Sequence, residues 1–346
     1  MEDCAAELDD GLFSFLKDTA PVKLCVACSG GSDSMALLSL LCEKKSLRHR
    51  LVVLHFNHGT RGDASDGDAD FVQCFAADMR ISFIVGCSDG TVTAHSGEEL
   101  LRRYRFRFFH REMARLSSPY LLTAHNRDDV IETFLMRLAR GSSVDGLVAL
   151  RPVEHRLDGR VYIRPLLSCS KNSLRNYLLA RHIPWREDES NASDLHLRNR
   201  VRHRLLPIWR TLEPQRALES CLLRTRALLV EDADALEELS QHCFLSAYLE
   251  NCLRVEALHG QPAAILRRVL HLFFLKNGHV LGRALIECLL RMRPFDRPFK
   301  ISITPELSCI SDGRKIYLLQ MHPRKSNSGR NFAERNFSNL HCKMSK

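Results

Sequence analysis

The sequence predicts an α/β protein: an open, mostly parallel sheet of five strands with helices on both faces, followed by a second, mainly helical domain. Short apolar runs alternate with longer stretches of helical periodicity, which is typical of strand and helix units in a parallel sheet. Most of the short runs are apolar throughout, as expected of strands covered on both faces. The expected strands are residues 23–28, 51–56, 81–86, 120–125 and 161–167.

The second half of the chain has a different pattern. Beyond residue 214 the apolar residues recur at helical spacing, and strand-like runs return only at residues 300–303 and 315–319. The last stretch is polar, basic and rich in Asn and Ser, which favours disorder. We therefore expect a first domain at residues 1–212, a mainly helical domain at 213–322 and a disordered tail at 323–346.

Composition narrows the class of protein. Of 346 residues 45% are apolar, which is enough for a core in each of two domains, and the thirteen cysteines lack the paired spacing of a disulfide framework. No signal-peptide pattern and no run of about 18 apolar residues occurs, so we expect a cytoplasmic protein without a membrane partner. The net charge of +9, with five arginines and no acid within residues 196–210, favours a polyanionic partner.

A glycine loop follows the first strand and leads directly into a helix. It consists of Ser29, Gly30, Gly31, Ser32, Asp33 and Ser34. Glycines let the backbone approach a ligand, while free amides at the helix start and serine hydroxyls donate to phosphate oxygens. Asp33 can hold the magnesium that accompanies a nucleoside triphosphate. The loop matches the S-G-G-x-D-S pattern of ATP pyrophosphatases, which implies cleavage between the α and β phosphates.

Two further groups of polar residues are weaker signals. Asn57 and His58 follow the second strand, at the edge of the sheet where a nucleotide would lie. Glu98, Arg102 and Arg105 recur along the third helical stretch, where arginines would hold phosphates and neutralise charge that develops in a displacement. Taken alone, each group is also explained by ordinary loop or surface chemistry.

An acidic cluster follows the fourth strand. It consists of His125, Asp128, Asp129 and Glu132, at offsets of three, four and seven. This spacing predicts that one helix face carries all four side chains. Because carboxylates stacked in this way repel each other by roughly a few tenths of a kcal/mol per pair, a cation among them explains the arrangement better. A lysine ammonium group or magnesium would serve.

These motifs occur in the same order as in the tRNA(Ile)-lysidine synthetases, and the chain resembles that family from residue 24 to residue 207. Later elements of the resemblance are Arg140-Gly141-Ser142, Asp188-x-Ser190-Asn191 and Arg198-Asn199-x2-Arg202. The loop alone marks only a wider superfamily, whereas the whole series is more restrictive. The resemblance implies an adenine nucleotide alpha hydrolase-like fold for the first domain and tRNA binding by the second.

The resemblance implies a ligase that uses ATP and Mg²⁺ and acts on free L-lysine and on tRNA(Ile) with a CAU anticodon. The C2 oxygen of the wobble cytidine attacks the α-phosphate of ATP, and the lysine side-chain amine then displaces AMP to form lysidine. A lysine amine with a pKa of about 10.4 is protonated at pH 7, and deprotonation costs roughly 4.6 kcal/mol. The site therefore needs a base or a desolvating pocket. No protein partner is expected.

The predicted roles fall into three groups. The catalytic residues are Asp33, Arg105, His125, Asp129 and Glu132. ATP is expected at the glycine loop, Asn57 and His58, and the other substrates at Glu98, Arg102, Asp128, Arg198, Asn199 and Arg202. Asp129 or Glu132 would orient the lysine ammonium group, and one of them or His125 would accept its proton. Arg105, with Arg198 or Arg202, would stabilise adenylyl transfer, and the RNA phosphates would contact Arg198, Arg200, Arg202 and Arg204.

Three alternatives stay open. A tRNA sulfur transferase has the same loop but generally needs a cysteine pair, and the one C-x-x-C, Cys25 and Cys28, lies in the first strand with its thiols on opposite faces. Amidation of a small molecule fits poorly with the basic segment and the added helical domain. A non-catalytic RNA-binding protein leaves the intact loop unexplained. Longer family members carry a further C-terminal domain, which we expect this chain to lack.

Overall fold

The computed structural model describes residues 16, 21–88, 96–156, 158–187, 197–212 and 217–320. The chain divides into two compact units, Met1–Ala233 and Asp234–Lys346, and the division falls inside helix α12 (Leu218–Ala247). The predicted domain boundary at residue 212 precedes that helix and stays a prediction. The predicted disordered tail lies outside the described residues.

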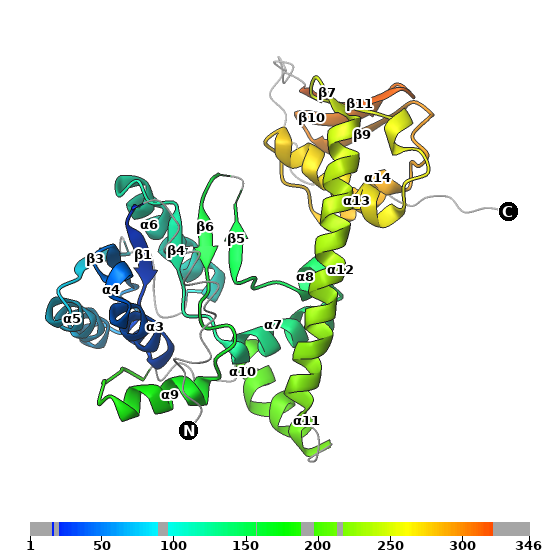
Figure 1. Ribbon diagram of the computed structural model, residues 1–346. Coiled ribbons are helices and arrows are strands. Elements are labelled where there is room, and N and C mark those ends of the chain that lie inside the picture. The colour runs from blue at the N-terminus through cyan, green and yellow to red at the C-terminus, as the bar shows by residue number, and fades with distance from the viewer. Residues whose placement is uncertain are drawn as a thin grey trace, which may run out of the picture. The chain divides into compact units, whose positions relative to one another are not determined.

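The first unit contains a six-stranded sheet with the order β3-β2-β1-β4-β6-β5 (Figure 1). Its parallel strands are β1 (Leu24–Ala27), β2 (Leu51–Asn57), β3 (Ser82–Cys87), β4 (Tyr120–Leu122) and β6 (Val161–Ile163). These are the five predicted strands, so the predicted fold class is confirmed. The sixth strand, β5 (Val153–His155), forms an antiparallel hairpin with β6. It was not predicted, since its three residues include a glutamate and a histidine and show no apolar run.

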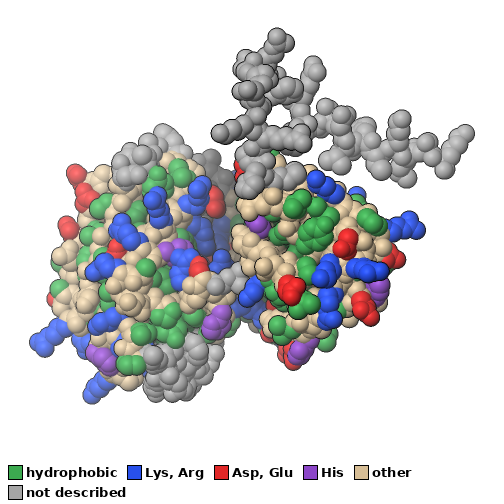
Figure 2. Space-filling model, turned by 90° about the horizontal axis from the view of Figure 1, so that it is seen from above, with side chains coloured by type: hydrophobic (Ala, Val, Ile, Leu, Met, Phe, Trp, Pro, Cys, Tyr) green, Lys and Arg blue, Asp and Glu red, His purple; other side chains and the backbone are tan. Residues whose placement is uncertain are grey.

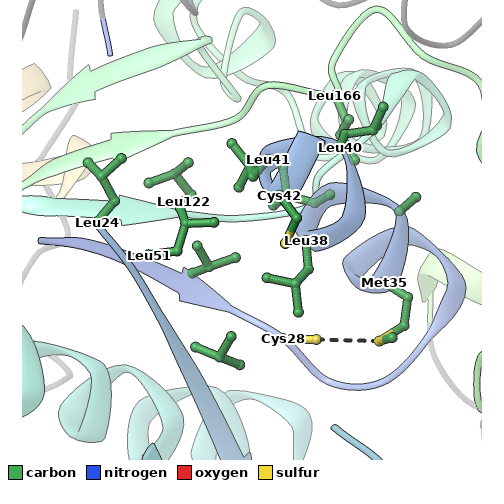
Figure 3. Close-up of a cluster of buried hydrophobic side chains, with 14 of the residues drawn as sticks. Leu24, Cys28, Met35, Leu38, Leu40, Leu41, Cys42, Leu51, Leu122 and Leu166 are labelled. Carbon is green, nitrogen blue, oxygen red and sulfur yellow. Dashed lines mark hydrogen bonds between the residues drawn. The ribbon is translucent and has the colours of Figure 1, made fainter. Parts of the chain in front are cut away.

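Helices cover both faces of this sheet. One face packs against α3 (Ser32–Glu43), α5 (Asp63–Asp78) and α9 (Lys171–Ala180), and the other against α6 (Glu98–Arg115). Figure 3 shows the first core, in which side chains of α3 lie against those of the strands. Cys28 belongs to this core and Cys25 to the core under α6, so the two thiols lie on opposite faces, as predicted. Short helix α4 (Lys45–Arg48) links α3 to β2.

The strand order indicates where a ligand site is expected in the first unit. From β1 the chain moves outward through β2 and β3, and then returns to the other side of β1 with β4. The carboxyl ends of β1 and β4 are therefore neighbours at the point where the strand order reverses, which is where ligands of open α/β sheets bind. The glycine loop and the acidic cluster follow these two strands.

A smaller helical layer follows β4. It contains α7 (Arg127–Ala139), α8 (Val144–Leu147), α10 (Leu197–Arg200), the π-helix Val201–Leu205, α11 (Leu206–Leu212) and the first half of α12. Its core is formed by Ile131, Phe134, Val201, Leu206 and Leu222. Arg226 of α12 donates to the carbonyl oxygens of Val148, Ala149 and Leu150. These contacts anchor the first half of α12 in the first unit.

The second unit combines helices with an antiparallel sheet. The strand order is β7 (Tyr248–Leu249), β8 (Cys252–Arg254), β11 (Lys315–Gln320), β10 (Leu307–Ser311) and β9 (Phe299–Thr304). The 3₁₀ helix Glu256–Leu258, α13 (Ala263–Lys276) and α14 (Arg283–Leu290) complete the unit, with Phe273, Phe274 and Phe295 in its core. The helical region was predicted, but the sheet has three strands more than the two expected: β7 and β8 are too short to show a pattern, and β10 was missed although it has five residues.

Two surface properties follow from the described residues. No helix among them is both long and apolar enough to cross a membrane. Figure 2 shows Lys and Arg side chains scattered over the visible face of the first unit. On that face the positive charge does not single out one binding surface.

Candidate functional site

The glycine loop is held open by its own serines. Ser34 Oγ donates to the Gly31 carbonyl oxygen at 2.9 Å and accepts from the Ser29 amide at 3.2 Å. Gly31 is the N-cap of α3 and lacks a side-chain cap hydrogen bond. The first amides of α3 are therefore available to a ligand, and the helix dipole favours an anion at this end.

Gly30 is required by the geometry of this turn. Its φ of +89° lies in the left-handed region, and a Cβ at this position would lie 3.2 Å from Val72 Cγ2 of α5. The Gly30 carbonyl oxygen accepts from the Arg186 amide at 2.9 Å, so the segment after α9 packs against the loop. A larger residue would disturb both the backbone and this contact.

Asp33 lies in the first turn of α3 and faces the start of α7. Burial raises the pKa of its carboxyl group, the Lys171 ammonium group opposes that shift, and Asp129 adds to it. Among the described residues, Asp33 Oδ1 is buried without a hydrogen-bond partner. A buried carboxylate oxygen with no donor fits a bound cation, so the predicted Mg²⁺ ligand is chemically suited to that role.

The start of α7 uses its acids for structure. Asn126 is the N-cap: its side chain accepts from the Asp129 amide, and Asp129 Oδ2 accepts from the Asn126 amide, both at 3.0 Å. Asp128 Oδ2 accepts from the Lys171 amide at 2.8 Å and so joins α7 to the start of α9. His125 precedes the N-cap. The prediction that one helix face carries all four residues of the acidic cluster is therefore wrong for His125, because the helix begins after it.

Glu132 is held by two arginines, and we call Glu132, Arg198 and Arg202 the arginine clamp. The Glu132 residue is 1% exposed. Arg202 donates to it from Nε at 2.6 Å and from Nη2 at 3.0 Å, and Arg198 Nε lies 3.3 Å from Oε2. Burial raises the pKa of the Glu132 carboxyl group, and the hydrogen bonds from Arg202 oppose that shift. The same bonds raise the pKa of Arg202. Both oxygens of Glu132 are engaged by arginines, so the carboxylate serves first as the anchor of these two cations.

His125 is a histidine of this region that stays neutral at pH 7. Its Nδ1 lies 2.9 Å from Thr123 Oγ1 at the end of β4. Burial lowers the pKa of His125 to about 4; Asp129 opposes the shift, while Arg164, Arg198 and Arg102 strengthen it. At neutral pH the ring is therefore uncharged, and the low pKa makes it a weak base.

The end of β2 contributes one side chain that is hydrogen-bonded within the protein and one that is available to a ligand. Asn57 is buried and satisfied internally, since it donates to Asp66 at 2.6 Å and accepts from the Gly59 amide at 2.8 Å. His58 Nδ1 has no hydrogen-bond partner among the described residues. Burial and the nearby Arg105 charge lower the pKa of His58 to about 4. His58 is therefore available to a ligand, whereas Asn57 shapes the turn.

The structure thus brings together most of the predicted residues. Asp129 and Arg202 act electrostatically on Asp33, Arg102 and Arg198 on His125, and Arg105 on His58. Asn199 is buried and stands between Arg198 and Arg202 in the sequence. Glu98 is the first residue of α6, but its side chain lies outside the described residues, as do Asp188, Ser190 and Asn191.

Sequence reasoning missed three basic residues of this region. Lys171 lies beside Asp33, Arg164 beside His125, and Arg186 against the glycine loop. Arg164 directly follows β6, and Lys171 opens the helix after it. The same rule that placed the other motifs at strand ends could have found these two residues.

The fold and the loop define a doubly wound α/β domain with an anion-binding helix start at its switch point. The model of the PP-loop domain family matches residues 6–209. The chain therefore belongs to the PP-loop domain family.

Individual relatives narrow the comparison. The chain is 37% identical over 256 residues to a tRNA(Ile)-lysidine synthase of Geobacter sulfurreducens, which covers 71% of this chain and 53% of the relative. It is 38% identical over 215 residues to one from Treponema denticola, covering 56% of this chain and 46% of the relative. The chain thus spans about half the length of these curated relatives.

Solved structures show the same fold at low identity. The U34-tRNA thiolase NcsA from Methanococcus maripaludis superposes with a TM-score of 0.54 at 19% identity, over 66% of this chain and 78% of that one. At this identity the likeness concerns the fold alone.

Proposed function

We propose that this protein forms lysidine in tRNA(Ile). It would adenylate the C2 oxygen of the wobble cytidine in the CAU anticodon and then join L-lysine there, with release of diphosphate and AMP. One observation carries the proposal: Asp33 of the glycine loop interacts electrostatically with Asp129 and Arg202, so a triphosphate and an amine can meet at one rim of the sheet. The relatives named tRNA(Ile)-lysidine synthase support it.

The phosphate-binding half of the site consists of the loop and nearby cations. The free amides at the start of α3 would bind the phosphates of ATP, and Asp33 would hold Mg²⁺, which shields the triphosphate charge. Arg202 is fixed by Glu132 with its charge close to Asp33. Such fixed donors stabilise charge that develops at the α-phosphate in the transition state.

The amine half of the site contains a neutral imidazole, His125, which as a weak base would relay the lysine proton and not store it. If His125 Nδ1 donates to Thr123 Oγ1, its Nε2 is left as an acceptor. The proton would pass from the lysine ammonium group to Nε2, and the amine electron pair would form the C–N bond at cytidine C2. The C–O bond would break, and AMP would leave with the oxygen. Asp129 would orient the ammonium group.

The direct test is incubation with ATP, labelled L-lysine and unmodified tRNA(Ile). We expect label in the RNA, and one AMP and one diphosphate for each lysine joined. A tRNA with uridine at the wobble position is the matched control and should take up no label, because its base lacks the cytidine amino group that the product retains. ATP turnover without RNA, or RNA that is unlabelled while ATP is consumed, would refute the proposal.

The alternative of a tRNA sulfur transferase has less support. The thiolase likeness concerns the fold alone, whereas the lysidine synthases are related in sequence over most of the chain. Cys25 and Cys28 lie in different cores, so they do not form a pair. Omitting lysine while supplying a sulfur donor would separate the two functions.

A further inference from the structure

The glycine loop has no cation of its own. Residues 29–34 comprise two glycines, three serines and one aspartate, without a lysine or an arginine. A triphosphate carries more negative charge than a single Mg²⁺ neutralises, and its leaving group gains further charge in the transition state. Enzymes of this chemistry place Lys or Arg beside the phosphates for that reason. Another part of the chain is therefore expected to supply the cation.

Arg186, in the segment after α9, lies directly against both glycines of the loop. Its amide donates to the Gly30 carbonyl oxygen at 2.9 Å. A Cβ built on Gly30 would lie 3.9 Å from Arg186 Cγ, and one built on Gly31 would lie 3.9 Å from the Arg186 carbonyl oxygen. The backbone and the stem of this side chain thus pack on a loop that is distant in the sequence.

Two residues of α5 hold the guanidinium group of Arg186. Its Cζ lies 5.2 Å from the centre of the Phe71 ring, which is within the range of a cation–π contact. Its Nε lies 3.9 Å from Asp68 Oδ1. Because α5 follows β2, it begins at the carboxyl edge of the sheet, where ligands of this fold bind, and Asp68 lies in its second turn. The guanidinium group is therefore held near that edge, beside the loop.

These contacts leave the donors of the guanidinium group available to an anion. Asp68 is bound more closely by another arginine, since Arg61 Nη2 donates to Asp68 Oδ2 at 2.6 Å. The Arg186 side chain is 54% exposed, and its distance of 3.9 Å from Asp68 is too long for a hydrogen bond. A guanidinium group has five donors in a planar fork that fits a phosphate group.

We propose that Arg186 binds the diphosphate end of ATP and supplies the cation that the glycine loop lacks. This inference rests on the proposed function. In adenylyl transfer a bond forms between the cytidine oxygen and the α-phosphorus, the bond from that phosphorus to the bridging oxygen breaks, and diphosphate leaves with the electron pair. Arg186 neutralises the charge that this leaving group gains. Asp68 and Phe71 hold the side chain in place before ATP binds.

Three variants of the full chain test this role. Arg186→Gln removes the charge and keeps the backbone amide that binds Gly30. Arg186→Lys keeps the charge and is the conservative rescue. Arg181→Gln is the matched control, because the Arg181 side chain is 40% exposed, lies 2.7 Å from the Glu43 carboxylate and stacks on Tyr177 at 4.2 Å. Glu43 ends α3, so this arginine lies at the opposite end of that helix from the loop.

Two measurements read out the effect. The first is isothermal titration calorimetry with ATP, with diphosphate and with AMP, each in the presence of Mg²⁺. We expect Arg186→Gln to weaken the binding of ATP and of diphosphate by about 10-fold, because a charge-assisted hydrogen bond is lost. AMP binding should be unchanged, since AMP lacks the leaving phosphates. The second is steady-state lysidine formation, in which KM for ATP should rise while KM for lysine stays the same.

Each outcome decides for or against the role of Arg186. Unchanged diphosphate affinity in Arg186→Gln overturns the inference, and so does an equal loss of AMP affinity, which would mean that the whole site is disturbed. An equal loss in Arg181→Gln, or no recovery of diphosphate affinity in Arg186→Lys, also contradicts it. Thermal melting checks that each variant folds.

The calorimetry also separates this inference from the proposed function. A wild type that binds ATP and diphosphate but forms no lysidine overturns the proposed function, whereas the comparison of diphosphate with AMP still reports on Arg186. A wild type that forms lysidine, with diphosphate affinity that does not depend on Arg186, keeps the proposed function and removes the inference.

Discussion

The glycine loop and the arginine clamp lie at the same rim of the sheet but are built differently. In the loop, backbone amides and two glycines form the candidate binding surface, and the Ser34 hydroxyl fixes the turn. In the clamp, charged side chains face one another, and Glu132 binds two arginines from a segment far along the chain. A site made of backbone follows directly from a local motif, whereas a site made of side chains depends on which partners the fold supplies.

The largest effect should come from the loop. Gly30→Ala forces a Cβ into a left-handed conformation and against Val72, and it should reduce lysine incorporation by about 100-fold or more, because the amides that bind phosphate are displaced. Gly159→Ala is the matched control, since Gly159 has φ +81° and open space around it. That variant should lose about 1–2 kcal/mol of unfolding free energy and keep its activity. Equal loss of activity in both variants would mean that backbone strain alone explains the result.

The second effect should come from the clamp. Glu132→Gln leaves two arginines without their buried carboxylate and should lower the free energy of unfolding by about 3–5 kcal/mol. Glu112→Gln is the control, since Glu112 is also buried and binds two arginines, but Arg111 and Arg115 are largely exposed. Urea denaturation should show a smaller loss there. A raised lysine KM and unchanged stability in Glu132→Gln would contradict the clamp.

Asp129→Asn retains an acceptor for the Asn126 amide and should raise KM for lysine with little loss of stability.

The smallest effect should come from exposed arginines of the same segment. Arg198 and Arg202 are bound to Glu132, whereas Arg200 and Arg204 are exposed. If Arg200 contacts an RNA phosphate, Arg200→Gln should flatten the slope of log K against log salt for tRNA binding by about one unit and leave KM for ATP unchanged. The same slope in the variant and the wild type would remove Arg200 from the RNA-binding surface.

Much of the fold could be predicted, because its signals are local. Five parallel strands, the helices between them and the loop that opens α3 follow from apolar runs and from glycine chemistry. The strand β5 was missed because its pairing with β6 is formed by three residues without apolar alternation. The same omission hid the ion-pair partner of Arg164, since Glu154 lies in that strand.

The acidic cluster shows where prediction from sequence stops. Its spacing correctly indicated one region with a strong electrostatic requirement, and repulsion among the acids suggested a cation. Spacing could not indicate that Asp129 completes the capping box of its own helix, that Asp128 accepts from the Lys171 amide at the start of α9, or that the cations near Glu132 are two arginines about 70 residues away. Each of these partners comes from a different part of the chain.

The sequence by itself determined the α/β class, the glycine turn that opens α3 and the placement of the candidate site residues after β1 and β4. These depend on periodicity and on backbone conformation, which neighbouring residues control. Only the tertiary structure decided which charged groups face one another, and therefore which of them stay ionised and which stay neutral. That outcome depends on burial and on distances between distant segments, because a charge in a protein is stabilised by its surroundings and not by its place in the chain.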